Sequence, residues 1–509
     1  MKSASGGKAA SATLAYDAVS DSVTLTADAE ATTFTPADVA IEASNLTRYE
    51  KTAGDTTTRL DLNWGYRSEW TTAPEYVALG QMLVRQRDVP TGIDTFRSID
   101  FAFGLPSEAS TVPRTGGASY ALSFMGTRTS LATDSLLQMG GSGTALVDFA
   151  GGSLEIVGKT YSFNWPSGGI MGVESPGDVK AKGTIAAGEN RFAGTFTATA
   201  GTADTYAGDL DGGFYGPGAK DIGGTLYGAS GPLFFSLAFA GYGIAKTYAD
   251  DTLANLEGTT RFRTAEASFT PQPLGNPLGE AIIYNAVTQT YVVGGQGIPL
   301  GFGITYGPAN RTPDKDTPDM RTYGAAQATV DGKIQYTMGV FDGKAQGIEL
   351  TYASFMQVSA VRTDLDGKVI DQGSGYIGFG NATAPDQMPR TGSASFAGLL
   401  FGDITDGKKS LASLNGRSEL TANFATGALA ASLSPVRLDA GGGSTALGKY
   451  EFNGAIDTYA ASFAAAWSGG AGSLAGRFYG DKAQEYAAAF NVQDPVLGQL
   501  VGVALGARK

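Results

Sequence analysis

Residues 207–227 read AGDLDGGFYGPGAKDIGGTLY, and residues 471–491 read AGSLAGRFYGDKAQEYAAAFN. The two stretches share the frame Ala-Gly-x-Leu-x-Gly-x-Phe-Tyr-Gly, followed in both by an Ala and an acidic residue at matching places. Further blocks recur in the same order: 14–27 with 282–295, 103–126 with 379–402, and 141–154 with 416–429. A repeat of two copies with so long a period predicts two homologous lobes in tandem, whereas a solenoid would show more copies at a shorter period.

The sequence of each lobe changes character at a Pro-Arg-Thr-Gly motif. The part before it is irregular, whereas the part after it alternates apolar with small or polar residues over strand-length spans, separated by Gly-Gly, Asp-Gly and Ser-Gly dipeptides. About eight such strands per lobe suit a closed up-and-down barrel, because closure removes exposed sheet edges. We therefore predict an all-β protein of two tandem lobes, each a mixed β handle domain followed by an eight-stranded antiparallel β-barrel.

The expected parts are a polar N-terminal tether (1–13), a first handle (14–111), a first barrel (112–248), an inter-lobe linker (249–275), a second handle (276–387) and a second barrel (388–509).

Composition limits the chemistry that the protein can perform. The 509 residues include 73 Gly, no Cys and no His, which excludes disulfides, thiolate or imidazole metal sites, and Ser-His or Cys-His nucleophile pairs. We therefore predict that the protein is not an enzyme and has no catalytic residues, no cofactor and no metal site. A pair of carboxylates that cleaves glycosides stays an alternative, although nothing in the sequence selects such a pair. The formal net charge of −13 disfavours nucleic acid as a partner.

Two kinds of short motif imitate ligand-binding loops. The stretches 402–409 and 443–450 fit Gly-x4-Gly-Lys, but Lys409 and Tyr450 stand where a phosphate-binding loop needs Ser or Thr. The stretch 364–375 begins like a calcium loop, but a glycine takes the place of the final bidentate carboxylate. We interpret all three as strand ends and hairpin turns.

The stretch GGFYGPGAKDIGGTLYG (212–228) resembles the barrel signature of the transferrin-binding protein B family of bacterial surface lipoproteins, Gly-x-Phe-Tyr-Gly-Pro-x-Ala-x-Glu-x-Gly-Gly-x-Phe. Asp221 stands in place of the Glu. In the second copy the Pro is absent, and Ala487 and Ala488 replace the two glycines. The Pro-Arg-Thr-Gly motif that opens each regular part is also similar to the family, whose members can be bilobed.

The resemblance implies a surface-exposed, lipid-anchored protein of a Gram-negative outer membrane. Such a protein captures a nutrient, with iron and haem sources among the candidates, and delivers it to a TonB-dependent transporter. The family is lipidated on an N-terminal Cys, which this sequence lacks, so the expected membrane contact is only through a lost anchor. A surface adhesin or surface-coat component without a transport role stays the alternative, and the ligand itself is not identified by the family.

One aromatic cluster is a candidate ligand-binding site. The stretch LNWGYRSEW (62–70) contains Trp64, Tyr66, Arg67 and Trp70, and these residue types are the most enriched at binding hot spots. The alternative is a handle core closed by aromatic side chains. No Trp occupies the aligned part of the second lobe, so the cluster is specific to the first.

Overall fold

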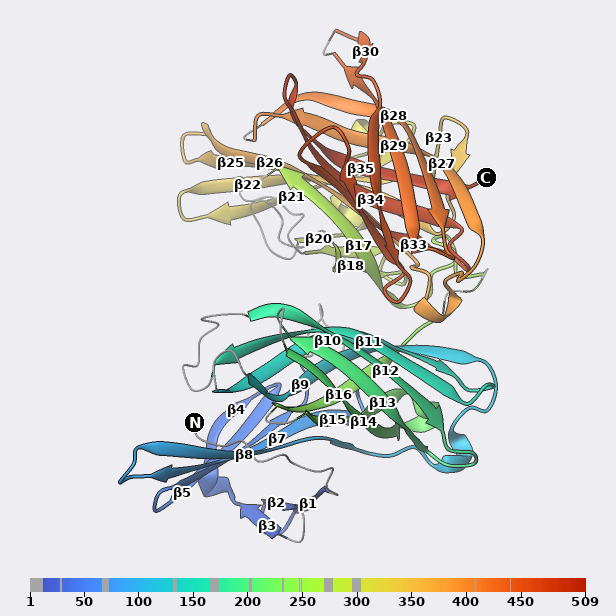
Figure 1. The fold of residues 1–509 in the computed structure, drawn as a ribbon. Helices are drawn as coiled ribbons and strands as arrows, with labels where there is room; N and C mark the ends of the chain where they lie inside the picture. The colour runs from blue at the N-terminus through green and yellow to red at the C-terminus, as the bar shows by residue number, and fades with distance from the viewer. Residues whose placement is uncertain are drawn as a thin grey trace. The chain divides into compact units, whose positions relative to one another are not determined.

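The structure is a computed structural model (Figure 1). It describes residues 12–27, 30–65, 73–130, 135–164, 174–200, 204–230, 233–246, 248, 250–269, 278–294, 304–407, 409–439 and 441–509. The chain divides into two compact units, Met1–Ala245 and Lys246–Lys509. Within the described ranges there is no α-helix, and none of the short 3-10 turns could cross a membrane.

The first barrel closes on itself. Its strands are β9 (Gly117–Ser130), β10 (Ser135–Asp148), β11 (Ser153–Asn164), β12 (Glu174–Ile185), β13 (Arg191–Ala200), β14 (Asp204–Tyr215), β15 (Asp221–Ser230) and β16 (Leu233–Ile244). Each strand pairs antiparallel with its chain neighbour, and β16 pairs with β9. Alternate residues of a strand point to one face, and the buried rings of Phe192, Phe214 and Phe239 pack together in the barrel core.

The first handle consists of two antiparallel sheets. One sheet contains β1 (Ala12–Asp17), β2 (Ser22–Ala27) and β3 (Glu30–Phe34), and the other contains β4 (Val39–Ala43), β5 (Leu46–Ala53), β6 (Thr56–Asn63), β7 (Val77–Asp88) and β8 (Ile93–Gly104). Strand β7 packs on the barrel, where Val77 and Leu79 contact Ala238 and Ala240 of β16 in a small buried cluster. The handle is therefore held to the barrel by apolar burial as well as by chain connection.

The second handle forms one larger antiparallel sheet. In sheet order its strands are β20 (Ile304–Tyr306), β19 (Thr290–Val293), β18 (Leu278–Asn285), β17 (Thr259–Phe269), β26 (Val369–Gly380), β25 (Ala353–Asp364), β22 (Gly332–Phe341) and β21 (Met320–Thr329). A separate hairpin joins β23 (Lys344–Ala345) to β24 (Ile348–Glu349). The two edge strands approach each other, because the rings of Tyr306 and Tyr323 lie 6.5 Å apart. The sheet is thus curled around its own core.

Strand β17 lies within residues 249–275, the range expected to be an inter-lobe linker. The strand pairs with β18 on one side and β26 on the other, and it buries Phe262, Ala265 and Ala267. This part of the chain is therefore an interior strand of the second handle, because its apolar residues and its backbone groups both find partners there.

The second barrel repeats the first. Its strands are β27 (Ser393–Thr405), β28 (Ser410–Asn423), β29 (Ala428–Leu438), β31 (Tyr450–Asp457), β32 (Ser462–Trp467), β33 (Gly472–Tyr479), β34 (Glu485–Asp494) and β35 (Gly498–Arg508). Pairing of β28 with β29 closes the eight strands, and the short β30 (Ser444–Ala446) adds to β29 outside the ring. The predicted all-β fold of two lobes with eight-stranded barrels is confirmed.

Candidate functional site

The repeated phrase builds the joint between handle and barrel. Gly216 and Gly480 both have a left-handed backbone, with φ of 73° and 77°. A Cβ atom on Gly216 would lie 2.3 Å from the ring of Tyr76, and one on Gly480 would lie 2.7 Å from the ring of Tyr352. Only glycine combines that backbone conformation with so close an approach. The phrase is therefore repeated because each lobe needs the same joint.

The acidic residue of the phrase ties the barrel to the handle backbone. The carboxylate of Asp221 accepts hydrogen bonds from the amides of Glu75 and Tyr76 at 2.6 and 2.7 Å. In the second lobe the carboxylate of Glu485 accepts hydrogen bonds from the amides of residues 351–353 at 2.7 to 2.9 Å. Burial raises the pKa of both acids. These carboxylates satisfy backbone donors at the start of β7 and β25, so their role is structural.

Of the residues predicted as a ligand-binding cluster, the structure describes Trp64, whereas Tyr66, Arg67 and Trp70 lie outside the described residues. The Trp64 side chain is 44% exposed, and its ring meets the edge of Phe103 at 5.2 Å. Its Nε1 donates a long hydrogen bond of 3.4 Å to Thr47 Oγ1. Trp64 therefore covers part of the handle and presents the rest of its ring to solvent, and the cluster stays a prediction.

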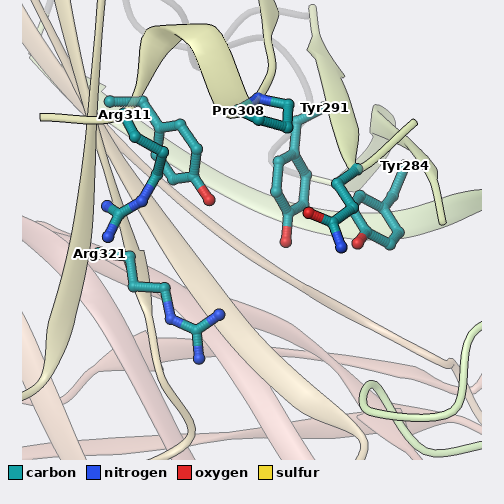
Figure 2. A pocket seen from close by; sticks show the side chains of 7 residues that line it. Tyr284, Tyr291, Pro308, Arg311 and Arg321 are labelled. Carbon is teal, nitrogen blue, oxygen red and sulfur yellow. The ribbon is translucent and has the colours of Figure 1, made fainter. Parts of the chain in front are cut away.

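A hollow of about 300 Å³ lies in the second handle (Figure 2). It is lined by Tyr284, Gln289, Tyr291, Pro308, Arg311, Arg321 and Tyr323. Figure 2 shows Tyr284 and Tyr291 side by side, with the guanidinium group of Arg321 across the hollow. The lining combines aromatic walls with polar groups, which is the composition typical of small-molecule sites.

Strand register places the tyrosines together. Tyr291 of β19 stands directly opposite Tyr284 of β18 and Tyr306 of β20, and residues directly opposite each other share a face of the sheet. The ring centroids of Tyr284 and Tyr291 are 4.5 Å apart. Tyr323 reaches Tyr291 from β21 at the other edge of the sheet, at 6.2 Å and nearly edge-on. The curl of the sheet therefore completes the aromatic wall.

Arg311 is fixed in place by its own loop. It follows the turn Pro308–Asn310, and its Nη1 and Nη2 donate to the two oxygens of Asp316 at 2.9 and 2.7 Å. Nη1 also donates to the carbonyl of Thr322 at 2.8 Å, and the guanidinium carbon lies 5.1 Å from the ring centre of Tyr323. A planar guanidinium held on both sides in this way forms a rigid part of the wall.

Arg321 is held more loosely. Its Nη2 lies 2.6 Å from Asp342 Oδ1, and the two side chains are 59% and 39% exposed. Such an exposed ion pair contributes little net stability, so it can exchange for another partner.

The protonation states make the hollow rich in donors. Burial raises the pKa of Tyr291 and Tyr323, so both phenols keep their protons at neutral pH. The guanidinium of Arg311, together with the amide of Thr322, lowers the pKa of Asp316 to about 2. The described lining residues include no carboxylate, so the hollow offers hydroxyl, guanidinium and amide donors to a ligand. Neutral phenols are poor metal ligands, and no cluster of acidic side chains able to hold a metal ion occurs in the described ranges.

The hollow of the second handle and Trp64 of the first lie at corresponding places. In the first handle Trp64 follows β6, and its backbone amide donates to the carbonyl of Asn45, which precedes β5. In the second handle Asp342 takes the same place: it follows β22, and its backbone amide donates to the carbonyl of Asp319, which precedes β21. In the first lobe Trp64 marks this place in the sequence. In the second lobe no local sequence signal marks it, because the aligned residue is acidic and the tyrosines are dispersed over several strands.

Comparison with known proteins was made on sequence and on fold. Residues 388–509 match the family described as the C-lobe and N-lobe β-barrels of Tf-binding protein B. No curated protein matches the chain by sequence.

Several solved structures have a similar chain trace. One is a mutant of transferrin-binding protein B from Haemophilus parasuis Hp5, at 16% identity and a TM-score of 0.30, covering 98% of this chain and 95% of that one. Another is the isotype 1 protein from serogroup B Neisseria meningitidis, at 14% identity and a TM-score of 0.28, covering 86% and 85%. Scores this low carry no argument by themselves.

The family match covers the second barrel, and the repeat within the chain relates the first lobe to it. The first lobe has the same glycine joint and the same closed eight-stranded ring as the second lobe, and a buried acid at the same place. The second barrel is therefore similar to the β-barrels of Tf-binding protein B, and the first lobe repeats its architecture.

Proposed function

We propose that the protein captures a nutrient at the surface of a Gram-negative outer membrane and delivers it to a TonB-dependent transporter. The observation that carries the proposal is the donor-rich hollow of the second handle, held by a rigid joint to a barrel that matches transferrin-binding protein B. Protonated tyrosines and guanidinium groups donate hydrogen bonds, so this lining suits the holding of a ligand. The protein therefore acts as a binding protein and not as an enzyme.

The arrangement of the lobes fits this role. Binding residues on loops and strand ends are best positioned by a rigid scaffold, and each closed barrel supplies one. We propose that the first handle spans residues 14–111 and that the barrels begin at residues 112 and 388. The second handle, predicted over residues 276–387, also includes β17 (Thr259–Phe269). We propose that Trp64, Tyr66, Arg67 and Trp70 of the first handle contact a larger partner. Anchoring through an N-terminal lipid would keep both handles at the cell surface.

A capture experiment from the native outer membrane tests delivery. The full chain, immobilised through its C-terminus, is incubated with detergent-solubilised outer membrane, and the retained proteins and small molecules are identified by mass spectrometry. Resin without the chain is the control for unspecific retention. Recovery of a TonB-dependent transporter supports the proposal. Recovery of only further copies of the chain or of surface polysaccharide would replace it with the adhesin or surface-coat function.

A further inference from the structure

We infer that the hollow of the second handle binds a small monoanion that carries a flat, unsaturated group, such as an aromatic carboxylate. The inference rests on the proposed function only in taking this hollow as the capture site. The ligand would place its carboxylate against Arg321 and its flat part against the tyrosines.

The charge of the ligand follows from the different states of the two arginines. Arg311 is neutralised by a two-pronged contact with Asp316, so it shapes the wall and adds no free charge. The described ion pair of Arg321 uses Nη2 toward an exposed Asp342. A guanidinium presents five donors in one plane, so a second carboxylate can bind along another edge of Arg321. One available cationic group selects for one negative charge.

The hydroxyl groups support the same ligand chemistry. Because burial keeps Tyr291 and Tyr323 protonated, their hydroxyls can donate to the oxygens of a bound anion. A cationic ligand would meet the guanidinium of Arg321 with no carboxylate among the described lining residues, so it is disfavoured.

The flat part of the ligand follows from the geometry of the walls. Tyr284 and Tyr291 are tilted by 36° at 4.5 Å, and Tyr323 stands at 73° to Tyr291. A further ring can therefore pack edge-on or offset against these faces, as aromatic groups prefer. A volume of about 300 Å³ limits the ligand to a small molecule.

The first handle provides an internal comparison. Thr47 of the first handle corresponds to Arg321 of the second, because they are the second residues of the matching strands β5 and β21. Trp64 likewise corresponds to Asp342. Val23 faces Tyr16 across β1 and β2, where the second handle has a pair of tyrosines. Among the described residues of the first handle, these corresponding places hold neither the cation nor the paired rings, and we expect one anion site per chain.

Calorimetric titration of the full chain tests the ligand class. The probes are benzoate, 4-hydroxybenzoate and 2-naphthoate, each compared with its uncharged carboxamide, together with acetate and a neutral disaccharide. We expect one site per chain, at least tenfold tighter binding of an aromatic carboxylate than of its carboxamide, and weak binding of acetate. Absence of binding by every aromatic carboxylate, equal binding of acid and amide, or preference for the disaccharide would overturn the inference.

Variants locate the site. Arg321→Gln should reduce carboxylate affinity at least tenfold and leave carboxamide affinity within twofold, whereas Tyr291→Phe should weaken the carboxylate several-fold. The matched control is Arg362→Gln, since Arg362 also forms an exposed pair in the same sheet, with Asp331 at 2.7 Å. Unchanged carboxylate affinity in Arg321→Gln, or an equal loss in Arg362→Gln, would overturn the assignment. Transporter capture by the Arg321→Gln chain is measured separately, so a failed ligand class and a failed delivery function give different results.

Discussion

The hydroxyl of Tyr376 donates a 2.8 Å hydrogen bond to Asp403 across the joint between the second handle and its barrel. In the first lobe the corresponding bond runs in the opposite direction, from Thr127 on the barrel to Asp100 on the handle, at 2.9 Å. Gln81 also donates to Asp100 at 2.7 Å. Besides Asp221 or Glu485, each joint therefore buries a further carboxyl group among hydrogen-bond donors, and the two lobes place it on opposite sides of the same contact.

The buried acid of the first lobe should make stability depend on pH. Burial raises the pKa of Asp100 to about 6, above the value of an unfolded Asp. An acid whose pKa rises on folding destabilises the folded state at pH values above its folded pKa, and this penalty disappears as the pH falls from about 6 to about 4. The unfolding free energy of Asp100→Asn, relative to that of the original chain, should therefore rise by about 2 kcal/mol between pH 4 and pH 7.5.

Calorimetric unfolding of both chains across that pH range measures the difference. The matched control is Asp211→Asn, because the side chain of Asp211 is 57% exposed on the barrel of the same lobe. A difference for Asp100→Asn that stays constant with pH, or that changes equally in the control, would contradict the assignment.

The joint glycine should tolerate no side chain. Gly216→Ala places a Cβ 2.3 Å from the ring of Tyr76 on a left-handed backbone, so the first lobe should lose more than about 2 kcal/mol of stability. Gly218→Ala is the control, because Gly218 has a similar φ of 63° but no atom within 4 Å of the added Cβ. Its loss should be about 1 to 2 kcal/mol, from backbone strain alone. Equal losses in denaturant unfolding would show that the contact with Tyr76 is unimportant.

Trp64 should matter more for binding than for folding. Since its ring is 44% exposed, Trp64→Ala should leave the unfolding temperature nearly unchanged and weaken binding of a partner captured from the outer membrane by more than about 1 kcal/mol. Surface plasmon resonance and calorimetry of the same preparations separate the two effects. A lower unfolding temperature with unchanged affinity would show that Trp64 packs in the core of the first handle and does not contact the partner.

The two units should fold separately. Each contains its own closed barrel and its own buried core, so residues 1–245 and 246–509 expressed alone should each be monodisperse and unfold cooperatively. The division before Lys246 keeps its ion pair with Asp386, at 3.0 Å, inside the second unit. Size-exclusion chromatography with circular dichroism checks this, and aggregation of both pieces would contradict the two-unit organisation.

The sequence by itself determined the all-β class, the two lobes and the eight-stranded barrels, because strand alternation, turn residues and the long repeat are local patterns that survive without tertiary information. It also singled out the repeated phrase that contains Gly216 and Asp221. The role of that phrase required the structure, because its partners, such as Tyr76, are far away in the chain.

Only the tertiary structure decided where the candidate site lies. Strand β17 lies in the range predicted to be a linker, because its two neighbours in the sheet come to lie beside it only on folding. Tyr284, Tyr291, Arg311, Arg321 and Tyr323 come from separate strands and a loop, and none of them stands out alone in a chain with 22 tyrosines. They meet because the sheet curls until β20 and β21 approach, and that curl is set by the packing of the whole handle core rather than by any local stretch of sequence.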